Sequence, residues 1–222
     1  MSDEKPVIHQ MWVGPEKPAI IRECMQSVRD MNPEFEYREW NDWNIPEFDY
    51  RDIMAQCEGP REISDILRIE ILRNYGGLFL DSDMLCLKSL YPLWSVADGS
   101  FSVMNEHGMS LTHSLNIHGA VIAARAHERW IEKTHDLIPQ IFKEIGHAHN
   151  VCPYQTAYDI ATCDFQIYGR TLYPLRIMQW CGDEYSDPYA YLIHIGHDNM
   201  YDPKMLERIQ RAKANGYWGV KC

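Results

Sequence analysis

The stretch REISDILRIEILRNYGGLFLDSDM, residues 61–84, contains the strongest structural signal in the chain. Its apolar residues recur mostly at three- and four-residue steps, which predicts a helix over residues 60–75. Gly76-Gly77 ends that helix, and Leu78-Phe79-Leu80 is a short apolar run typical of a buried strand. Asp81-Ser82-Asp83 follows directly. Carboxylates just past the carboxyl end of a buried strand project into the crevice where open α/β sheets bind ligands.

Strands and helices alternate along most of the remaining chain. This alternation predicts an α/β fold with a mostly parallel central sheet flanked by helices. The length of 222 residues suits one compact domain, or a domain with a small appendage. Further strands are expected at 7–13, 35–40, 101–105, 117–123, 166–168 and 189–195, and further helices at 18–31, 127–145, 153–161 and 203–214.

Composition excludes several classes of protein. The formal net charge is −11 and no run of Lys or Arg occurs, which argues against a nucleic-acid partner. No stretch approaches the ~18–20 apolar residues of a transmembrane segment, and the beginning MSDEKPVIHQ shows no signal peptide. The seven cysteines are scattered without CxxC spacing, so we expect reduced thiols and a cytoplasmic protein. An acidic protein can still bind a phosphate ligand through a divalent cation.

Asp81 and Asp83 are the first candidate metal ligands. Mn²⁺ and Mg²⁺ prefer oxygen ligands, and such ions typically bind one or two carboxylates together with phosphate oxygens of a substrate. The alternative is a solvated turn, or a helix N-cap formed by Asp83. Asp-x-Asp is common by chance in acidic loops, so it is the preceding helix and buried strand that favour the metal site.

Asp65 and Arg68 lie three residues apart in the predicted helix and therefore share a face. One interpretation is an ordinary i,i+3 ion pair, which contributes little to stability. The other places the pair beside the metal, where Asp65 accepts sugar hydroxyls and Arg68 donates to hydroxyl or phosphate oxygens. The spacing alone favours the ordinary ion pair.

The opening strand contains a second group of candidates. Trp12 or Trp40 can stack on a nucleotide base, and Gln10 can form hydrogen bonds to the edge of the base. An apolar strand with a buried tryptophan explains the same residues equally well.

The segment HIGHDN at 194–199 follows a late apolar run and can complete a metal site. His197, Asp198 or Asn199 can supply the remaining ligand. A His pair at i and i+3 can also bind zinc, but no matching Cys or Glu motif accompanies it. The alternative is that these histidines bind no metal and form ordinary hydrogen bonds within the protein. The polar, His-rich stretch 108–118 is a candidate mobile loop near a site.

Together these segments resemble the glycosyltransferases whose sugar-binding region contains a DXD motif. That family includes fungal initiating mannosyltransferases and bacterial capsular polysaccharide transferases, and is distantly similar to the glucosyltransferase domains of clostridial toxins. The similarity rests on VIHQMWVG at 7–14 and on Ser-Asp-x-x-Arg, Tyr-Gly-Gly and Asp-x-Asp within 61–84. Weaker similarity continues downstream, where Cys152 replaces a glycine.

The resemblance implies a GT-A fold in one domain, 1–222, with the donor-binding part at about 1–105 and the acceptor side at about 106–222. It implies retaining, Mn²⁺- or Mg²⁺-dependent transfer from a UDP-sugar or GDP-mannose to a glycan or other hydroxyl acceptor. Asp65, Arg68 and Asp83 are then the catalytic residues. The donor site comprises His9, Gln10, Trp12, Asp65, Arg68, Asp81 and Ser82, and the metal ligands are Asp81, Asp83 and one or more of His194, His197 and Asn199.

Two other functions compete with this one. FLDSDML at 79–85 superficially resembles the nucleophile strand of haloacid-dehalogenase phosphatases. That motif normally lies on the first strand, however, and has different residues after its second aspartate. The second alternative is a catalytically degenerate protein that binds a nucleotide sugar without turnover. Intact Asp-x-Asp and Ser-Asp-x-x-Arg motifs argue against such decay.

Overall fold

A computed structural model describes residues 5–105, 116–146, 171–173, 178–180, 190–196 and 200–214. The elements expected at 153–161 and 166–168 lie outside these ranges. The described elements are β1 (Val7–Met11), α1 (Ala19–Met31), β2 (Glu36–Trp40), α2 (Arg51–Met54), α3 (Pro60–Tyr75), β3 (Gly77–Leu80), β4 (Met84–Cys86), α4 (Tyr91–Val96), β5 (Phe101–Asn105), β6 (Asn116–Ala124), α5 (Arg129–Ile145), β7 (Thr171–Tyr173), β8 (Met178–Trp180), β9 (Leu192–His194) and α7 (Pro203–Ala214).

The main sheet has the strand order β2-β1-β3-β6-β5-β7. Three of its five strand pairs are parallel, namely β1 with β2, β1 with β3, and β5 with β7. β6 runs antiparallel to both of its neighbours, β3 and β5. The predicted α/β sheet is therefore confirmed, with one reversed strand in its middle.

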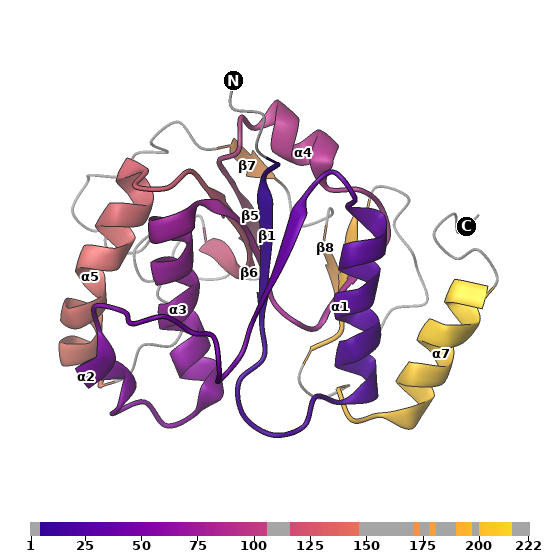
Figure 1. The fold of residues 1–222 in the computed structure, drawn as a ribbon, viewed down its shortest axis with the longest axis horizontal. Coiled ribbons are helices and arrows are strands. Elements are labelled where there is room, and N and C mark those ends of the chain that lie inside the picture. Colours follow the sequence, from indigo (N-terminus) through magenta and orange to yellow (C-terminus); the bar gives the residue numbers. More distant parts are fainter. Residues whose placement is uncertain are drawn as a thin grey trace.

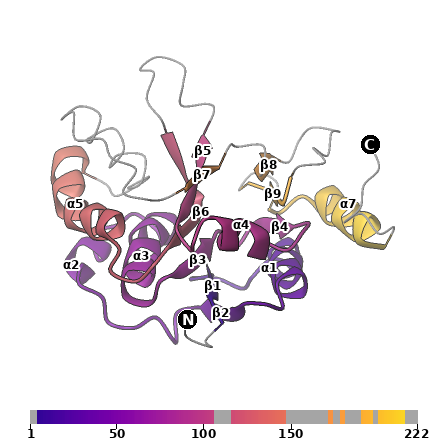
Figure 2. The ribbon, with the colours of Figure 1, turned by 90° about the horizontal axis from the view of Figure 1, so that it is seen from above.

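Helices cover both faces of this sheet, as Figures 1 and 2 show. α3 and α5, with α2 beside them, lie on one face, and α1 lies on the other with α7 beyond it. The side chains of β3 alternate accordingly: Phe79 packs in the cluster with α3 and α5, whereas Leu78 and Leu80 pack in the cluster that includes Val28 of α1. Burial on both faces explains why β3 is apolar throughout.

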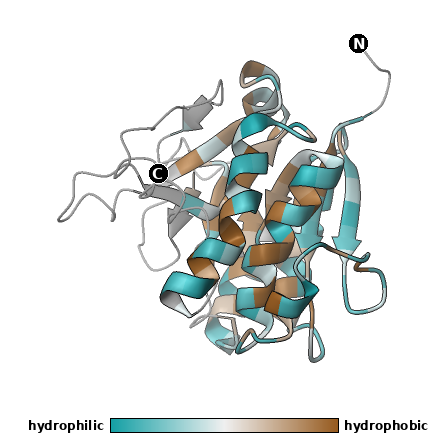
Figure 3. Cartoon of the chain, turned by 90° about the vertical axis from the view of Figure 1, so that its left-hand side faces the viewer, coloured by the Kyte–Doolittle hydropathy of each residue, from teal (hydrophilic) through white to brown (hydrophobic). Residues whose placement is uncertain are grey.

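The outer helices show the expected amphipathic pattern. In Figure 3 the α2, α3 and α5 side of the molecule faces the viewer, with hydrophilic and hydrophobic stripes running along the helices. α3 is an exception among them because the side chains of Glu62, Asp65, Arg68 and Glu70 are all buried. Charged side chains are rarely buried without partners, so α3 is the element that carries the polar chemistry of this layer.

Gly76 and Gly77 are required at the junction between α3 and β3. Their φ angles are +63° and +106°, a region that side-chain-bearing residues rarely adopt. A Cβ atom on Gly76 would lie 2.7 Å from the backbone nitrogen of Ala126, and one on Gly77 would lie 2.9 Å from Nε2 of His9. This pair lets the chain reverse sharply, so that the strand leading to Asp81 lies directly against α3.

A second, three-stranded sheet has the order β4-β9-β8. β4 pairs antiparallel with β9, and the register places Met84 opposite His194. The backbone N–H of Ile195 donates to the carbonyl of Asp83 at 3.1 Å. This pairing brings the late histidine beside the Asp-x-Asp turn, across more than a hundred residues of sequence.

The described residues bear on the expected membrane segments and thiols. No helix among them is long and apolar enough to cross a membrane. Cys24, Cys57 and Cys86 are thiols that form no disulfide.

Candidate functional site

The Asp-x-Asp segment forms a tight turn between β3 and β4. The backbone N–H of Asp81 donates to the carbonyl of Ala120 at 2.9 Å, and the N–H of Met84 donates to the carbonyl of Asp81 at 3.2 Å. Nε2 of Gln10 also donates to that carbonyl, at 2.9 Å. The turn is therefore held from β6, β4 and β1, with half-buried Ser82 between its two carboxylates.

The two carboxylates and His194 form a group whose ligand atoms lie close enough together to hold a metal ion. Nε2 of His194 lies 3.3 Å from Oδ2 of Asp83. One ligand atom from each of Asp81, Asp83 and His194 lies within 4.8 Å of the others. The structure thus brings together three of the five predicted metal ligands. His197 and Asn199 lie outside the described residues.

Arg68 connects this group to α3. Its Nη2 lies 2.9 Å from Oδ1 of Asp65 and 3.0 Å from Oδ1 of Asp81, and its Nη1 donates to the carbonyl of Gly119. Asp65 and Arg68 are both buried. The i,i+3 ion pair that the spacing favoured is therefore present, but it is buried and belongs to a network that reaches the Asp-x-Asp turn.

Burial and neighbouring charges set the protonation of these groups in opposite directions. Burial raises the pKa of Asp81, and the charge of Asp83 adds to this effect against the attraction of Arg68. Burial also disfavours ionised Asp83, but the hydrogen bond and charge of His194 outweigh it and lower the pKa of Asp83. Burial lowers the pKa of His194, but Asp83 and Asp81 outweigh it and raise that pKa. The crowded negative charge favours a cation.

His118 and Gly119 of β6 are part of this site, although sequence reasoning assigned them no role. The rings of His118 and His194 meet edge to face, with centroids 5.4 Å apart. Nδ1 of His118 accepts from the N–H of Ala120 at 3.1 Å. Burial and the charges of His194 and Arg68 lower the pKa of His118 to about 3, so this ring is neutral. The His-rich composition of 108–118 was the only sequence signal for it.

The candidates on β1 have contacts within the protein. His9 is fully buried, with Nε2 2.8 Å from the carbonyl of Gly76, and its Nδ1 accepts from Nε1 of Trp40 at 3.1 Å. Gln10 is also fully buried, and its Oε1 accepts from the hydroxyl of Tyr37 at 2.9 Å. These contacts give His9, Gln10 and Trp40 partners within the protein.

Trp12 remains accessible at the end of β1. Its ring is partly buried against the cluster of Ile21, Met25 and Met200, and its Nε1 donates to the carbonyl of Pro15 at 2.7 Å. Among the aromatic residues considered for base stacking, Trp12 is therefore the one that the structure leaves available.

A pocket of about 400 Å³ lies near Val13 and Gly14 but belongs to a different part of the molecule. Ile63 and Leu67 of α3 line it. At 100° per residue these two positions lie on the face of α3 opposite to Asp65 and Arg68. The pocket is thus separate from the carboxylate site.

Solved structures of glycosyltransferases match this fold along nearly the whole chain. The galactosyltransferase LgtC, in complex with donor and acceptor sugar analogues, matches with a TM-score of 0.57 and 14% identity over 97% of each chain. The glycosyltransferase GlyE of Streptococcus pneumoniae matches with a TM-score of 0.58 and 10% identity, covering 98% of this chain and 61% of that one. The fold is thus the GT-A fold predicted from the sequence.

The family can be stated from the sequence match. The capsular polysaccharide synthesis protein family matches residues 1–215, and the chain belongs to this family. Inositol phosphoceramide mannosyltransferase 3 of Schizosaccharomyces pombe is 37% identical over 93 residues, which are 39% of this chain and 26% of that protein. Mannosyl phosphorylinositol ceramide synthase SUR1 of Saccharomyces cerevisiae is 31% identical over 93 residues, which are 39% of this chain and 24% of that protein. The match spans about a quarter of the length of these two relatives.

Proposed function

We propose that this protein is a metal-dependent glycosyltransferase that moves a sugar from a nucleoside-diphosphate donor to a hydroxyl group of a glycan or glycolipid. The observation that carries the proposal is the convergence of Asp81, Asp83 and His194 on one point, with Arg68 bridging Asp81 to Asp65. A binding site for a nucleoside-diphosphate sugar needs positive charge for the diphosphate and hydrogen-bond acceptors for the sugar hydroxyls. Asp81, Asp83 and His194 can hold a cation, Arg68 adds a second positive charge, and Asp65 is a hydrogen-bond acceptor.

The residues present fit a divalent cation. Asp81 and Asp83 offer hard oxygen ligands, and His194 offers one imidazole nitrogen. Two carboxylates that share a site with diphosphate oxygens favour Mn²⁺ or Mg²⁺, and the imidazole is more compatible with Mn²⁺. When bound, such an ion supplies positive charge that stabilises the leaving diphosphate.

The chain's own residues then orient the donor. Arg68 carries guanidinium N–H groups between Asp65 and Asp81, which supports a role in donating to a phosphate or sugar oxygen at that point. We assign to Asp65 the role of accepting hydrogen bonds from sugar hydroxyls. Gln10 acts indirectly because it holds the carbonyl of Asp81. We assign base stacking to Trp12.

We propose transfer with retention of configuration. The acceptor hydroxyl oxygen forms a bond to the anomeric carbon on the face from which the diphosphate departs. The bond between that carbon and the diphosphate oxygen breaks, and the hydroxyl proton passes to the departing phosphate oxygen. Arg68 stabilises the charge that develops there.

The relatives guide the choice of donor. The names of both fungal relatives refer to mannosyl transfer, or to a mannosyl lipid product, which supports GDP-mannose as one donor to test. The family description supports a polysaccharide acceptor. UDP-sugars form the other group of donors.

The test is a calorimetric titration of UDP-sugars and GDP-mannose, with and without Mn²⁺, on the wild type and on Asp83→Asn. We expect one donor to bind only with Mn²⁺ and to lose that binding in Asp83→Asn. Metal-dependent binding without transfer to any acceptor would identify a degenerate binding protein. Absence of binding under all conditions would overturn the proposal, and phosphomonoester hydrolysis would be assayed next.

A further inference from the structure

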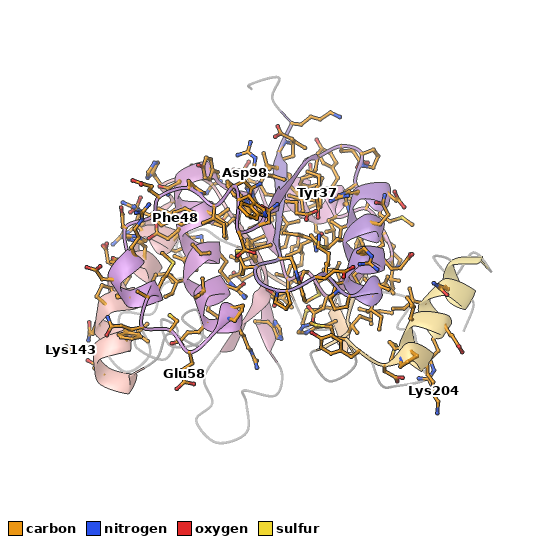
Figure 4. The ribbon with its side chains drawn as sticks, turned by 60° about the horizontal axis from the view of Figure 1, so that its bottom comes forward. Tyr37, Phe48, Glu58, Asp98, Lys143 and Lys204 are labelled. Carbon is orange, nitrogen blue, oxygen red and sulfur yellow. The ribbon has the colours of Figure 1, made fainter. Side chains whose placement is uncertain are left out.

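A second cluster of ligand-type side chains lies away from the Asp-x-Asp turn, within the helical layer on the other side of α3. It consists of Asp49 in the loop before α2, Glu70 on α3 and His135 on α5. One ligand atom from each lies within 4.8 Å of the others. Figures 1 and 2 show α2, α3 and α5 grouped on the same face of the sheet, and Figure 4 shows Phe48, the residue before Asp49, in this layer.

The two innermost groups carry buried polar atoms without a hydrogen-bond partner. Glu70 is 0% exposed and His135 is 3% exposed. Oε2 of Glu70 and Nε2 of His135 are both buried, and neither atom forms a hydrogen bond. A buried polar atom without a partner is costly, and such atoms point to a missing ligand.

The distances around Nε2 of His135 match those of a tetrahedral metal site. This nitrogen lies 3.2 Å from Oε1 of Glu70 and 3.5 Å from Oδ2 of Asp49. Ligand atoms about 2.1 Å from a zinc ion at tetrahedral angles lie roughly 3.4 Å from one another. The same spacing accompanies a nitrogen that forms no hydrogen bond, and ligands around a common point would have both properties.

The rest of the surroundings fix the ligands in place. The Tyr50 ring lies beside the His135 ring, with centroids 4.5 Å apart, and the Tyr50 hydroxyl lies 3.4 Å from Nδ1 of His135. The backbone N–H of Asp49 donates to Oε1 of Glu70 at 3.2 Å. Nη1 of Arg73 lies 2.9 Å from Oδ2 of Asp49, and its Nε lies 2.7 Å from Oε2 of Glu132. The single positive charge of Arg73 is therefore shared between these two carboxylates. Negative charge from Glu70 and Asp49 remains in excess.

We propose that Asp49, Glu70 and His135 bind a zinc-type divalent cation that joins the loop before α2 to α3 and α5. A neutral imidazole and two carboxylates suit zinc, and water completes the fourth position on the exposed side of Asp49. The ion holds α3 from behind, on the helix whose other face presents Asp65 and Arg68. The site is structural and independent of sugar transfer.

The competing explanation is a buried ion pair between protonated His135 and Glu70. It predicts no response to metal. The two explanations also differ at Asp49, whose side chain is 60% exposed and adds little to an ion pair screened by solvent. As a metal ligand, in contrast, Asp49 has a large effect on affinity.

The experiment uses the full chain carrying Asp83→Asn, so that the Asp-x-Asp site cannot account for the signal. After treatment with a chelator and its removal, Zn²⁺ is titrated by calorimetry and thermal unfolding is followed. We expect one equivalent to bind and the midpoint to rise by on the order of 5–10 °C at a hundredfold excess over Kd. Co²⁺ added in place of Zn²⁺ reports a tetrahedral site through its visible absorption.

Three double variants decide the assignment. Asp83→Asn combined with Asp49→Asn or with Glu70→Gln should lower Zn²⁺ affinity at least tenfold. Asp83→Asn combined with Asp136→Asn is the matched control, because Asp136 lies 3.8 Å from the other ring nitrogen, Nδ1, and should leave affinity unchanged. If Glu70→Gln fails to fold, the exposed Asp49→Asn still decides. A chain without Zn²⁺ binding, or equal affinity in Asp49→Asn, would overturn the proposal.

Discussion

At the scale of single residues, Asp83 contributes to the candidate site through both its side chain and its backbone. Its carboxylate meets Nε2 of His194 at 3.3 Å, and its backbone carbonyl accepts from Ile195 at 3.1 Å. Substitution of the side chain leaves the backbone contact in place. The carboxylate and the backbone can therefore be separated by mutation, with chemistry affected and the strand pairing retained.

Asp83→Asn should lower kcat/KM for transfer by at least a hundredfold, the size expected when a charge that holds the transition state is removed. The midpoint of thermal unfolding should change by only a few degrees, since the isosteric amide preserves packing. Asp98→Asn is the control, because Asp98 is an exposed carboxylate paired with Arg125. Normal metal-dependent activity in Asp83→Asn would show that Asp83 is not a metal ligand.

His9 gives a prediction about pH and stability. Burial lowers its pKa to about 4 from an ordinary 6.5, against the hydrogen bond to Gly76. Between these values the unfolded chain binds a proton that the folded chain does not, so folding stability falls as the pH falls through 6.5 towards 4. From pH 7 to pH 5 this group costs about 2 kcal/mol.

The variant His9→Gln isolates this effect, because all other titrating groups are common to both proteins. Urea unfolding at pH 7 and pH 5 should show a stability loss about 2 kcal/mol smaller in the variant than in the wild type. Equal losses in the two proteins would mean that His9 is protonated in the folded state or exposed to solvent.

At the scale of elements, the contact between α3 and β6 controls Arg68. The carbonyl of Gly119 accepts from Arg68, and a Cβ atom at position 119 would lie 2.8 Å from Nη1 of Arg68. The guanidinium group is held by Asp65 and Asp81, so it cannot move aside without losing one of these ion pairs.

Gly119→Ala should therefore raise the donor Kd about tenfold or more while the chain stays folded, because it displaces Arg68 from one of these contacts, each worth roughly 1–3 kcal/mol. Binding is measured by calorimetry with Mn²⁺ and circular dichroism reports the fold. Gly59→Ala is the control: its Cβ meets nothing within 4 Å and its φ of 176° is ordinary extended backbone. Unchanged donor affinity in Gly119→Ala would show that Arg68 does not contact the donor.

Elements with strong local patterns were the ones predictable from sequence. α3 runs over Pro60–Tyr75 as expected, because sixteen residues of periodic spacing end at a glycine pair. β4 has three residues, α2 four and α4 six, too few to produce a periodic signal, and none of them was predicted. The reversed direction of β6 depends on pairing with distant strands and has no local signal either.

The residues of the candidate site also differ in whether they are close together in the sequence or are brought together only by folding. Asp65, Arg68, Asp81 and Asp83 fall within nineteen consecutive residues, and the strand before Asp81 and Asp83 favoured a ligand site there. The role of Asp65 and Arg68 beside that site came from the family resemblance. His194 came from family resemblance, since its position depends on the pairing of β4 with β9. Asp49, Glu70 and His135 are separated by 21 and 65 residues and share no motif, so their proximity becomes visible only in the folded chain.

At the scale of the whole molecule, the proposed metal joins two separate sheets. Asp81 follows β3 of the six-stranded sheet, whereas His194 ends β9 of the three-stranded sheet. Beside the proposed metal, the N–H of Ile195 contacts the carbonyl of Asp83. A ligand that binds only the joined arrangement must stabilise it by mass action. Metal and nucleotide binding should therefore make the segment around β9 more rigid.

Hydrogen exchange measures this coupling directly. With Mn²⁺ and the nucleoside diphosphate of the donor, amide exchange at 192–195 should slow at least tenfold, while exchange within α5 stays unchanged. Asp83→Asn should abolish the protection at 192–195, since the carboxylate that shares the ion with His194 is gone. If Mn²⁺-dependent nucleotide binding occurs without slower exchange at these residues, then β9 does not contribute a metal ligand. The third ligand would then come from elsewhere in the chain, or from water.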